Sequence, residues 1–132
     1  MPKAIRMVHD VDPKQTIWDA IGEEANSVEV LGAQLLVSAY MRPDKTAGGI
    51  ILSDKTRGED AHQGKIGLVL KMGPLAFVED AEHRFGGKRP QVGDWVLFRI
   101  GDGFPFIIND TNCRFIEDVA IKAIVTTPDA FW

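Results

Sequence analysis

The sequence predicts an all-β fold, a small barrel or sandwich with a long mobile loop and a short N-terminal helix. From Val28 onward, short apolar runs alternate with turn signals, a pattern typical of small barrels and sandwiches. A single helix start precedes these runs, and a glycine-rich segment around Gly48 interrupts them. With 132 residues the chain is long enough to bury a core. We therefore expect an N-terminal extension at residues 1–27 and one barrel domain at residues 28–132.

The short helix is predicted at residues 13–25. Asp12 suits the N-cap, Pro13 suits the first helical position, and Gln15 stands where a capping box has its second member. The apolar face of this helix consists of Ile17, Trp18 and Ile21. Because so short a helix is marginal alone, we expect this face to dock on its own barrel or on a neighbouring subunit. Deletion of residues 1–27 is expected to leave the barrel folded.

Strands are predicted at residues 34–41, 65–72, 95–100, 104–108, 113–116 and 121–125. The clearest is 65–72, in which bulky apolar residues occupy every second position from Ile66 to Leu70. Residues 109–112 are expected to form the polar loop of a hairpin, and Glu117-Asp118 to cap a single helical turn. The stretch 75–91 is predicted to be irregular, and loops of that length are usually functional or mobile.

The glycine-rich segment carries three consecutive bulky aliphatic residues. Gly48 and Gly49 stand directly before Ile50-Ile51-Leu52, and small or charged residues flank them throughout 42–63. Two adjacent glycines weaken any regular element, and the apolar run is too short for a helix. The pattern favours a sticky tripeptide on a flexible tether. Taken alone, the segment slightly favours a short buried strand that follows a glycine turn, because most three-residue aliphatic runs are core, and the rest of the chain changes that preference.

Composition excludes several classes of function. A formal charge of −4 without a basic stripe argues against a nucleic-acid binder. No apolar run approaches the roughly 20 residues that a membrane span needs, and the N-terminus lacks the apolar segment of a secretory signal. Cys113 is the single cysteine, so no intrachain disulfide can form, which fits a reducing compartment such as the cytoplasm.

No catalytic, metal-binding or cofactor-binding constellation is predicted. The three histidines lie far apart without metal-ligand spacing, at His9, His62 and His83. Cys113 has apolar neighbours, which predicts an inert and partly buried thiol. Asp10 and Asp12 could bind a cation, but helix capping by Asp12 explains them more simply. We therefore expect no enzymatic activity.

Several motifs follow one another in a specific order along residues 28–125. They are Lys45-Thr46-Ala47-Gly48-Gly49-Ile50-Ile51-Leu52, Val69-Leu70-Lys71-Met72-Gly73-Pro74, Val92-Gly93-Asp94-Trp95-Val96-Leu97-Phe98, Phe115-Ile116-Glu117-Asp118 and Ile121-Lys122-Ala123-Ile124-Val125. In this order and spacing they resemble the GroES-like co-chaperonins. The resemblance implies a GroES-like β-barrel assembled as a homo-oligomeric ring, a heptamer, that caps a GroEL-type chaperonin and assists ATP-dependent folding of non-native protein. A co-chaperonin does no chemistry, because its partner hydrolyses the nucleotide.

The resemblance also implies which residues bind partners. The chaperonin would be bound by Gly48, Gly49, Ile50, Ile51 and Leu52, with the aliphatic side chains docking in a groove between two helices of the chaperonin. In the family the first and last barrel strands pair across subunits. Here the implied interface residues are Leu35, Leu36 and Val37 in 35–39, and Ile121, Ala123, Ile124 and Val125 in 121–125.

Three departures from the short bacterial members indicate a divergent, phage-encoded co-chaperonin. They are the extension 1–27, the long stretch 75–91 and the aromatic end Phe131-Trp132. Such a protein would work in the host cytoplasm with a host or phage-encoded chaperonin, and viral capsid protein would be its cargo.

Three other interpretations compete with this one. A structural β-barrel module of a virus or larger complex would have no need of the aliphatic tripeptide. An oligonucleotide-binding barrel is disfavoured by the negative charge and by the lack of interleaved aromatic and basic residues. A fragment related to zinc alcohol dehydrogenases would need a set of cysteine and histidine ligands that the sequence lacks.

Overall fold

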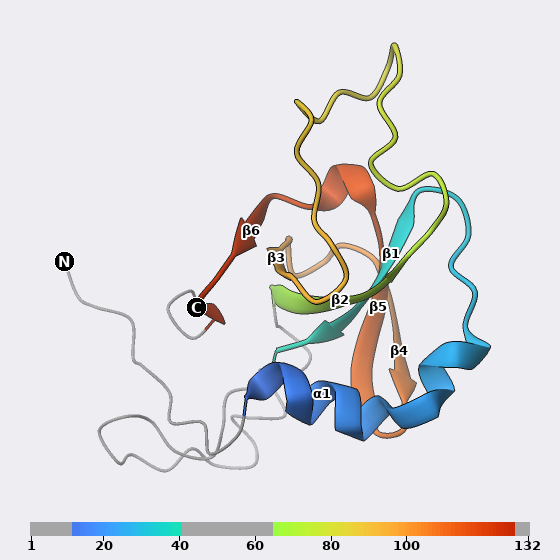
Figure 1. The fold of residues 1–132 in the computed structure, drawn as a ribbon, viewed down its shortest axis with the longest axis vertical. Helices are drawn as coiled ribbons and strands as arrows, with labels where there is room; N and C mark the ends of the chain where they lie inside the picture. Colours follow the sequence, from blue (N-terminus) through green and yellow to red (C-terminus); the bar gives the residue numbers. More distant parts are fainter. Residues whose placement is uncertain (1–11, 41–64, 129–132) are drawn as a thin grey trace, which may run out of the picture.

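The computed structural model describes residues 12–40 and 65–128. Helix α1 (Pro13–Ile21) continues into the 3-10 helix η1 (Gly22–Ser27), and a second 3-10 helix, η2 (Asp118–Ala120), lies between the last two strands. The strands are β1 (Gln34–Ala39), β2 (Ile66–Met72), β3 (Trp95–Leu97), β4 (Phe104–Ile108), β5 (Thr111–Glu117) and β6 (Ala123–Val125). They form one antiparallel sheet in the order β4-β5-β1-β2-β3-β6. Helix α1 lies across one end of the sheet, and the irregular stretch after β2 rises from the other (Figure 1). The predicted all-β fold with one short helix is confirmed.

Local signals set the limits of α1. The Asp12 carboxylate accepts a hydrogen bond from the Lys14 backbone N–H at 2.9 Å, which confirms the predicted N-cap. Gln15 does not complete a capping box, because its amide donates to Asp19 instead, at 2.7 Å. Gly22 ends the α-helix with a φ of +61°, a conformation that glycine adopts without strain.

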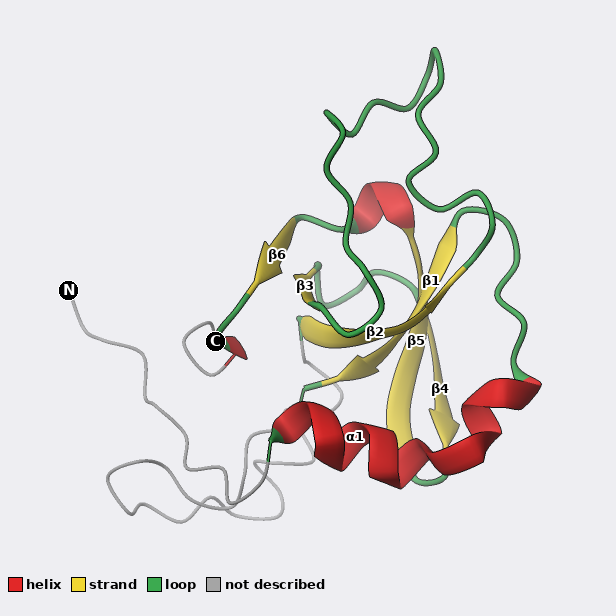
Figure 2. Ribbon diagram, in the orientation of Figure 1, coloured by secondary structure: helices red, strands yellow, loops and turns green. Residues whose placement is uncertain are grey.

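The two central strands are apolar on both faces. In β1, Leu36 points to one face of the sheet while Leu35 and Val37 point to the other. Strand β2 alternates in the same way, with Leu68 and Leu70 opposite Val69, as its sequence predicts. Two separate hydrophobic clusters result, one on each face, and both must be covered from outside the sheet. Figure 2 shows the helix α1 crossing the strands at one end and the loops gathered at the other.

Helix α1 and η1 cover the first face. Ile17, Ile21 and Ala25 are buried against the cluster that contains Leu36 and Leu68. The Asn109 side chain, in the turn between β4 and β5, donates to the Ile21 carbonyl at 2.9 Å and holds the end of the helix. The helix therefore docks on its own barrel rather than being held in reserve for a neighbouring subunit.

The second face is covered by the start of the irregular stretch that follows β2. Ala76 and Phe77 are buried against Leu35 and Val37. The Phe77 N–H donates to the carboxylate of buried Asp118 at 2.9 Å, and this bond holds Phe77 at a φ of +60°. Although residues 75–91 lack regular structure, as predicted, this part of the loop is fixed to the core. The Asp118 side chain serves this bond and does not cap η2, contrary to the expectation for Glu117-Asp118.

The hairpin between β4 and β5 is tighter than predicted. Asn109 and Asp110 alone form the turn, with φ values of +46° and +62°, and Thr111 already belongs to β5. Positive φ at both central positions is the pattern of a type I′ turn, which matches the twist of the flanking strands. The predicted four-residue loop at 109–112 is therefore wrong.

Replacement of Ile21 by alanine should destabilise the protein by about 2–5 kcal/mol, because it opens a cavity under α1. The same change at Ile107, which is 64% exposed on β4, should shift stability by no more than about 0.5 kcal/mol. Chemical denaturation of both variants at equal protein concentration measures the difference. Equal loss at the two sites would show that α1 is not part of the core.

Deletion of residues 1–27 should likewise unfold the barrel, because it uncovers the cluster around Leu36 and Leu68. This outcome replaces the expectation from the sequence that the barrel would stay folded. Loss of the cooperative transition in the truncated chain is the expected result, and a truncated chain with unchanged thermal stability would contradict it.

Candidate partner-binding surfaces

The docking tripeptide predicted at Ile50, Ile51 and Leu52, with Gly48 and Gly49, lies outside the described residues. The structure does show where that segment leaves and rejoins the core. Residue 40 follows β1 and residue 65 precedes β2, which are adjacent antiparallel strands.

The junction at Tyr40 is rigid. The Tyr40 N–H donates to the Ile66 carbonyl at 2.9 Å. Its ring is fully buried and packs edge-on against Trp95, with 5.4 Å between ring centroids. The segment 41–64 is therefore anchored at both ends to the middle of the sheet.

The predicted interface residues of β1 are buried inside the chain. Leu35, Leu36 and Val37 have no exposed surface. Strand β1 lies between β2 and β5 and is hydrogen-bonded to both. Strand β1 therefore has no free backbone edge in this placement. The structure gives no support to the prediction that β1 pairs with a strand of another subunit.

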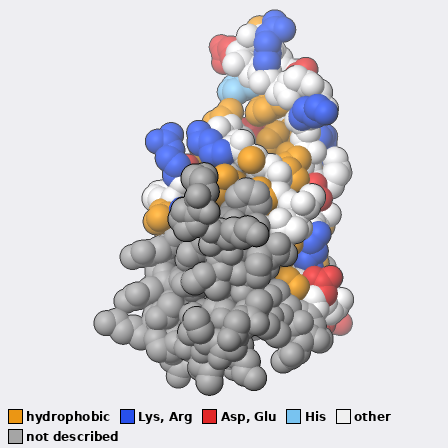
Figure 3. Space-filling model, turned by 90° about the vertical axis from the view of Figure 1, so that its left-hand side faces the viewer, with side chains coloured by type: hydrophobic (Ala, Val, Ile, Leu, Met, Phe, Trp, Pro, Cys, Tyr) orange, Lys and Arg blue, Asp and Glu red, His pale blue; other side chains and the backbone are white. Residues whose placement is uncertain are grey.

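The predicted interface residues of β6 fall into two groups. Ile121 and Val125 pack into the two hydrophobic clusters of the chain itself. Ala123 and Ile124 are exposed, and Ile124 keeps 47% of its surface in contact with solvent. Strand β6 is the last of the sheet and pairs with β3 alone, so its outer backbone edge is free in the described part of the chain. Figure 3 looks onto this side of the molecule and shows hydrophobic side chains above the undescribed residues.

A second candidate surface, residues 28–31, is missing from the sequence predictions. Val28 is extended, with φ −100° and ψ 121°, and burial then alternates between exposed Glu29, buried Val30 and Leu31, which is 69% exposed. Lys71 fixes the segment by donating to the Val28 carbonyl at 2.7 Å. No strand of the described residues pairs with it. The alternation of valine with a charged residue in Val28-Glu29-Val30 is a sequence signal for an extended segment. The segment lies before the first predicted strand, which begins at residue 34.

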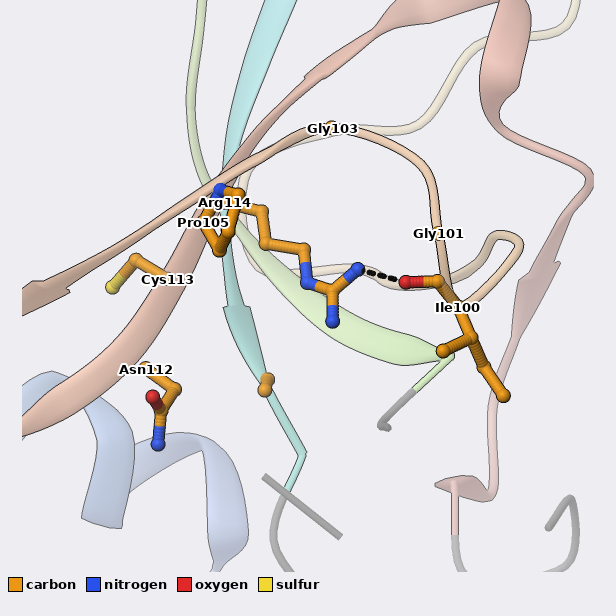
Figure 4. Close-up of a pocket in the computed structure, with 8 residues that line it drawn as sticks. Ile100, Gly101, Gly103, Pro105, Asn112, Cys113 and Arg114 are labelled. Carbon is orange, nitrogen blue, oxygen red and sulfur yellow. Dashed lines mark hydrogen bonds between the residues drawn. The ribbon is translucent and has the colours of Figure 1, made fainter. Parts of the chain in front are cut away.

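A pocket of about 270 Å³ opens between β4, β5 and the loop after β3 (Figure 4). Arg114 crosses it and donates to the carbonyl oxygens of Ile100 and of Asp102, the latter at 3.1 Å. Its guanidinium also lies over the Phe98 ring, 5.6 Å from the centroid. Burial lowers the pKa of Arg114. These contacts tie the loop 99–103 to β5, which is a structural role.

The other side chains considered for chemistry in the sequence are Cys113 and the histidines. Burial raises the pKa of the Cys113 thiol to about 11, so it is protonated at neutral pH. His83 is half exposed in the loop after β2 and contacts the Asp80 carboxylate at 3.2 Å, while His9 and His62 lie outside the described residues. Hydrogen bonds from the backbone N–H groups of His83 and Glu82 lower the pKa of Asp80.

Within residues 12–40 and 65–128, no cluster of three or more His, Cys, Asp or Glu side chains is placed to hold a metal ion. The helices of these ranges are also too short or too polar to span a membrane.

A family model matches most of the chain. The family model described as "Chaperonin 10 Kd subunit" matches residues 27–125, about three quarters of the chain. The match includes residues 28–31, the segment 41–64 and β6, whereas α1 lies before its start. No curated protein matches the chain.

The Cys113 thiol should be almost unreactive in the folded protein. With a pKa of about 11, on the order of one thiol in a thousand is ionised at pH 8, and the side chain is buried as well. Labelling by a disulfide reagent at pH 8 should therefore follow global unfolding. Rapid labelling of the folded protein would contradict the buried placement.

The same thiol should make stability fall at high pH. The unfolded thiol loses its proton from about its ordinary pKa of 9.0, whereas the folded thiol keeps it to about 11. Between these pH values the unfolded state binds fewer protons, so the free energy of unfolding decreases as pH rises. Below pH 9 the thiol contributes no slope. A Cys113→Ala variant, unfolded by urea across this range, should show a shallower decline than the wild type.

Proposed function

The chain belongs to the chaperonin 10 kDa subunit family, and we propose that it caps a GroEL-type chaperonin through the aliphatic tripeptide Ile50-Ile51-Leu52. Membership makes it a co-chaperonin of the GroES type, a partner of a chaperonin rather than a catalyst, and implies an oligomeric ring. The observation that carries the proposal is the family match, which spans the tripeptide and both strands that anchor its segment.

Anchoring at Tyr40 and Lys65 supports a docking role for the segment between them. A partner held by the tripeptide would be connected directly to β1 and β2, the two most buried strands of the sheet. Force on the docked segment would then be carried by the sheet rather than by a loose terminus.

The free energies of burial and of backbone ordering predict weak binding by one tripeptide and strong binding by a ring that presents several. Burial of three bulky aliphatic side chains contributes about 5–9 kcal/mol, at about 1.5–3 kcal/mol each. Ordering the backbone costs about 1–2 kcal/mol per residue, so a handful of ordered residues offsets most of that gain. A ring that presents several copies binds through effective concentration, and weak single contacts still allow release.

We propose that neighbouring subunits join through the free edge of β6 and the extended segment 28–31. Ala123 and Ile124 are exposed on β6, and Leu31 is exposed on the other surface. The two surfaces differ, and contacts between unlike surfaces close into rings when the rotation fits. We further propose seven subunits, a cytoplasmic location and non-native protein as cargo. A phage origin, and viral capsid protein as the cargo, rest on the sequence features at 1–27, 75–91 and Phe131-Trp132 alone.

Replacement of Ile51 by aspartate should abolish chaperonin binding and leave the ring intact. In the docked complex the change places an unpaired carboxylate in an apolar groove, at a cost of several kcal/mol per site that multiplies across the ring. Retention on immobilised chaperonin with nucleotide measures binding, and light scattering measures ring mass.

The matched control is Thr56→Asp, which adds the same charge outside the tripeptide and should bind as the wild type does. An Ile51→Asp ring that binds at wild-type strength would remove the tripeptide from the docking role. A wild-type ring that is never retained would favour a structural module instead.

Aspartate at Ile124 or at Leu31 should break the ring into species near the monomer mass of 14.6 kDa. Each change puts a charge into the proposed contact, while its exposure in the monomer leaves the fold unaffected. Ile107→Asp, at an exposed aliphatic residue on β4 at the opposite edge of the sheet, is the control and should retain the ring. Intact rings in both interface variants would overturn the proposed contact.

A further inference from the structure

Strand β4 is an exposed edge with the composition of an aggregating segment. Its sequence Phe104-Pro105-Phe106-Ile107-Ile108 is wholly apolar and carries no charge. It is the outermost strand on its side of the sheet, and Phe104 is 66% exposed. Segments of this kind at a sheet edge invite pairing with other chains. Pro105, the second residue of the strand, is the residue of β4 that opposes such pairing.

The hairpin register shows which backbone groups β4 offers to the outside. A two-residue turn at Asn109 and Asp110 makes Ile108 and Thr111 a hydrogen-bonded pair. Because hydrogen-bonded and non-hydrogen-bonded pairs alternate, Phe106 and Phe104 also bond to β5. The backbone groups of Pro105 and Ile107 therefore point away from β5, along the free edge.

A proline at position 105 thus removes one of the two outward N–H groups of β4 without removing a hydrogen bond between β4 and β5. Proline has no N–H, and its position opposite Arg114 is one where β5 needs none. Ile107 keeps the single outward N–H of the strand. A strand added to this edge would therefore receive one backbone hydrogen bond from β4, donated by Ile107, instead of two.

The opposite edge of the sheet has no such protection. Strand β6 reads Ala123-Ile124-Val125, without proline, and its outward side chains are exposed. Among the described strands, the backbone edge of β6 is therefore free to pair, whereas that of β4 is interrupted by Pro105. We propose that Pro105 is a specificity-determining residue for assembly, which confines pairing between copies of this chain to β6 by closing β4.

The consequence concerns how copies can add to one another. With one open edge per chain, each subunit accepts one strand on β6, and a head-to-tail contact can close. With two open edges, β4 could pair with β4 or with β6 of other copies, and branched or open-ended species would compete with the ring.

The test is Pro105→Thr, which restores the outward N–H and a β-prone side chain. We expect a broad population larger than the wild-type particle in analytical ultracentrifugation, formed in proportion to protein concentration. Adding Ile107→Pro to this variant closes the edge again at the other outward position, and should restore the wild-type size distribution. Phe104→Thr, which removes an exposed aromatic side chain and adds no N–H, is the control and should leave the distribution unchanged.

Hydrogen exchange of the assembled wild-type protein gives a second measurement. The Ile107 amide should exchange more than about tenfold faster than the Phe106 amide, because only the latter bonds to β5. Two results would overturn the proposal: a protected Ile107 amide in the assembled particle, or a Pro105→Thr protein with the wild-type distribution. Neither depends on chaperonin binding, so a protein that fails to bind a chaperonin can still pass this test.

Discussion

The structure depends on one constraint, which is that the central strand pair is apolar on both faces. Leu36 requires cover on one side, and Leu35 and Val37 require it on the other. Helix α1 takes one face, and the loop segment around Phe77 takes the other. Their side-chain contacts, Asn109 to Ile21 and Phe77 to Asp118, hold each cover in place.

The candidate binding surfaces follow from the same arrangement. Because β1 is occupied on both edges, it offers no backbone edge to another chain, whereas β4 and β6 are the outer strands of the described sheet and no described strand pairs with segment 28–31. Tyr40 and Ile66, on either side of the segment 41–64, are fully buried in the same hydrophobic cluster. The proposed partner surfaces therefore lie at the periphery of a buried centre.

Local features were predictable from the sequence, whereas long-range ones were not. The Asp12 N-cap and the alternation of burial in β2 depend only on residues close in sequence, and both were found where predicted. The position of β1 between β2 and β5 depends on residues up to 83 positions away, so no local pattern showed that Leu35 to Val37 would be interior. The order of motifs did reveal the family, because spacing along the chain carries information that single motifs lack. The docking tripeptide stays a prediction, since it lies outside the described residues.

The hydrogen bond from Asn109 to Ile21 joins residues 88 positions apart and has a consequence for biosynthesis. Helix α1 leaves the ribosome well before the hairpin that holds it is made. Until then Ile17 and Ile21 have no complete sheet to pack on, and the nascent chain presents an apolar helix face to solvent. Folding of the core must wait until the chain has been synthesised past Asn109, which makes a co-chaperonin dependent on late, long-range contacts for its own folding.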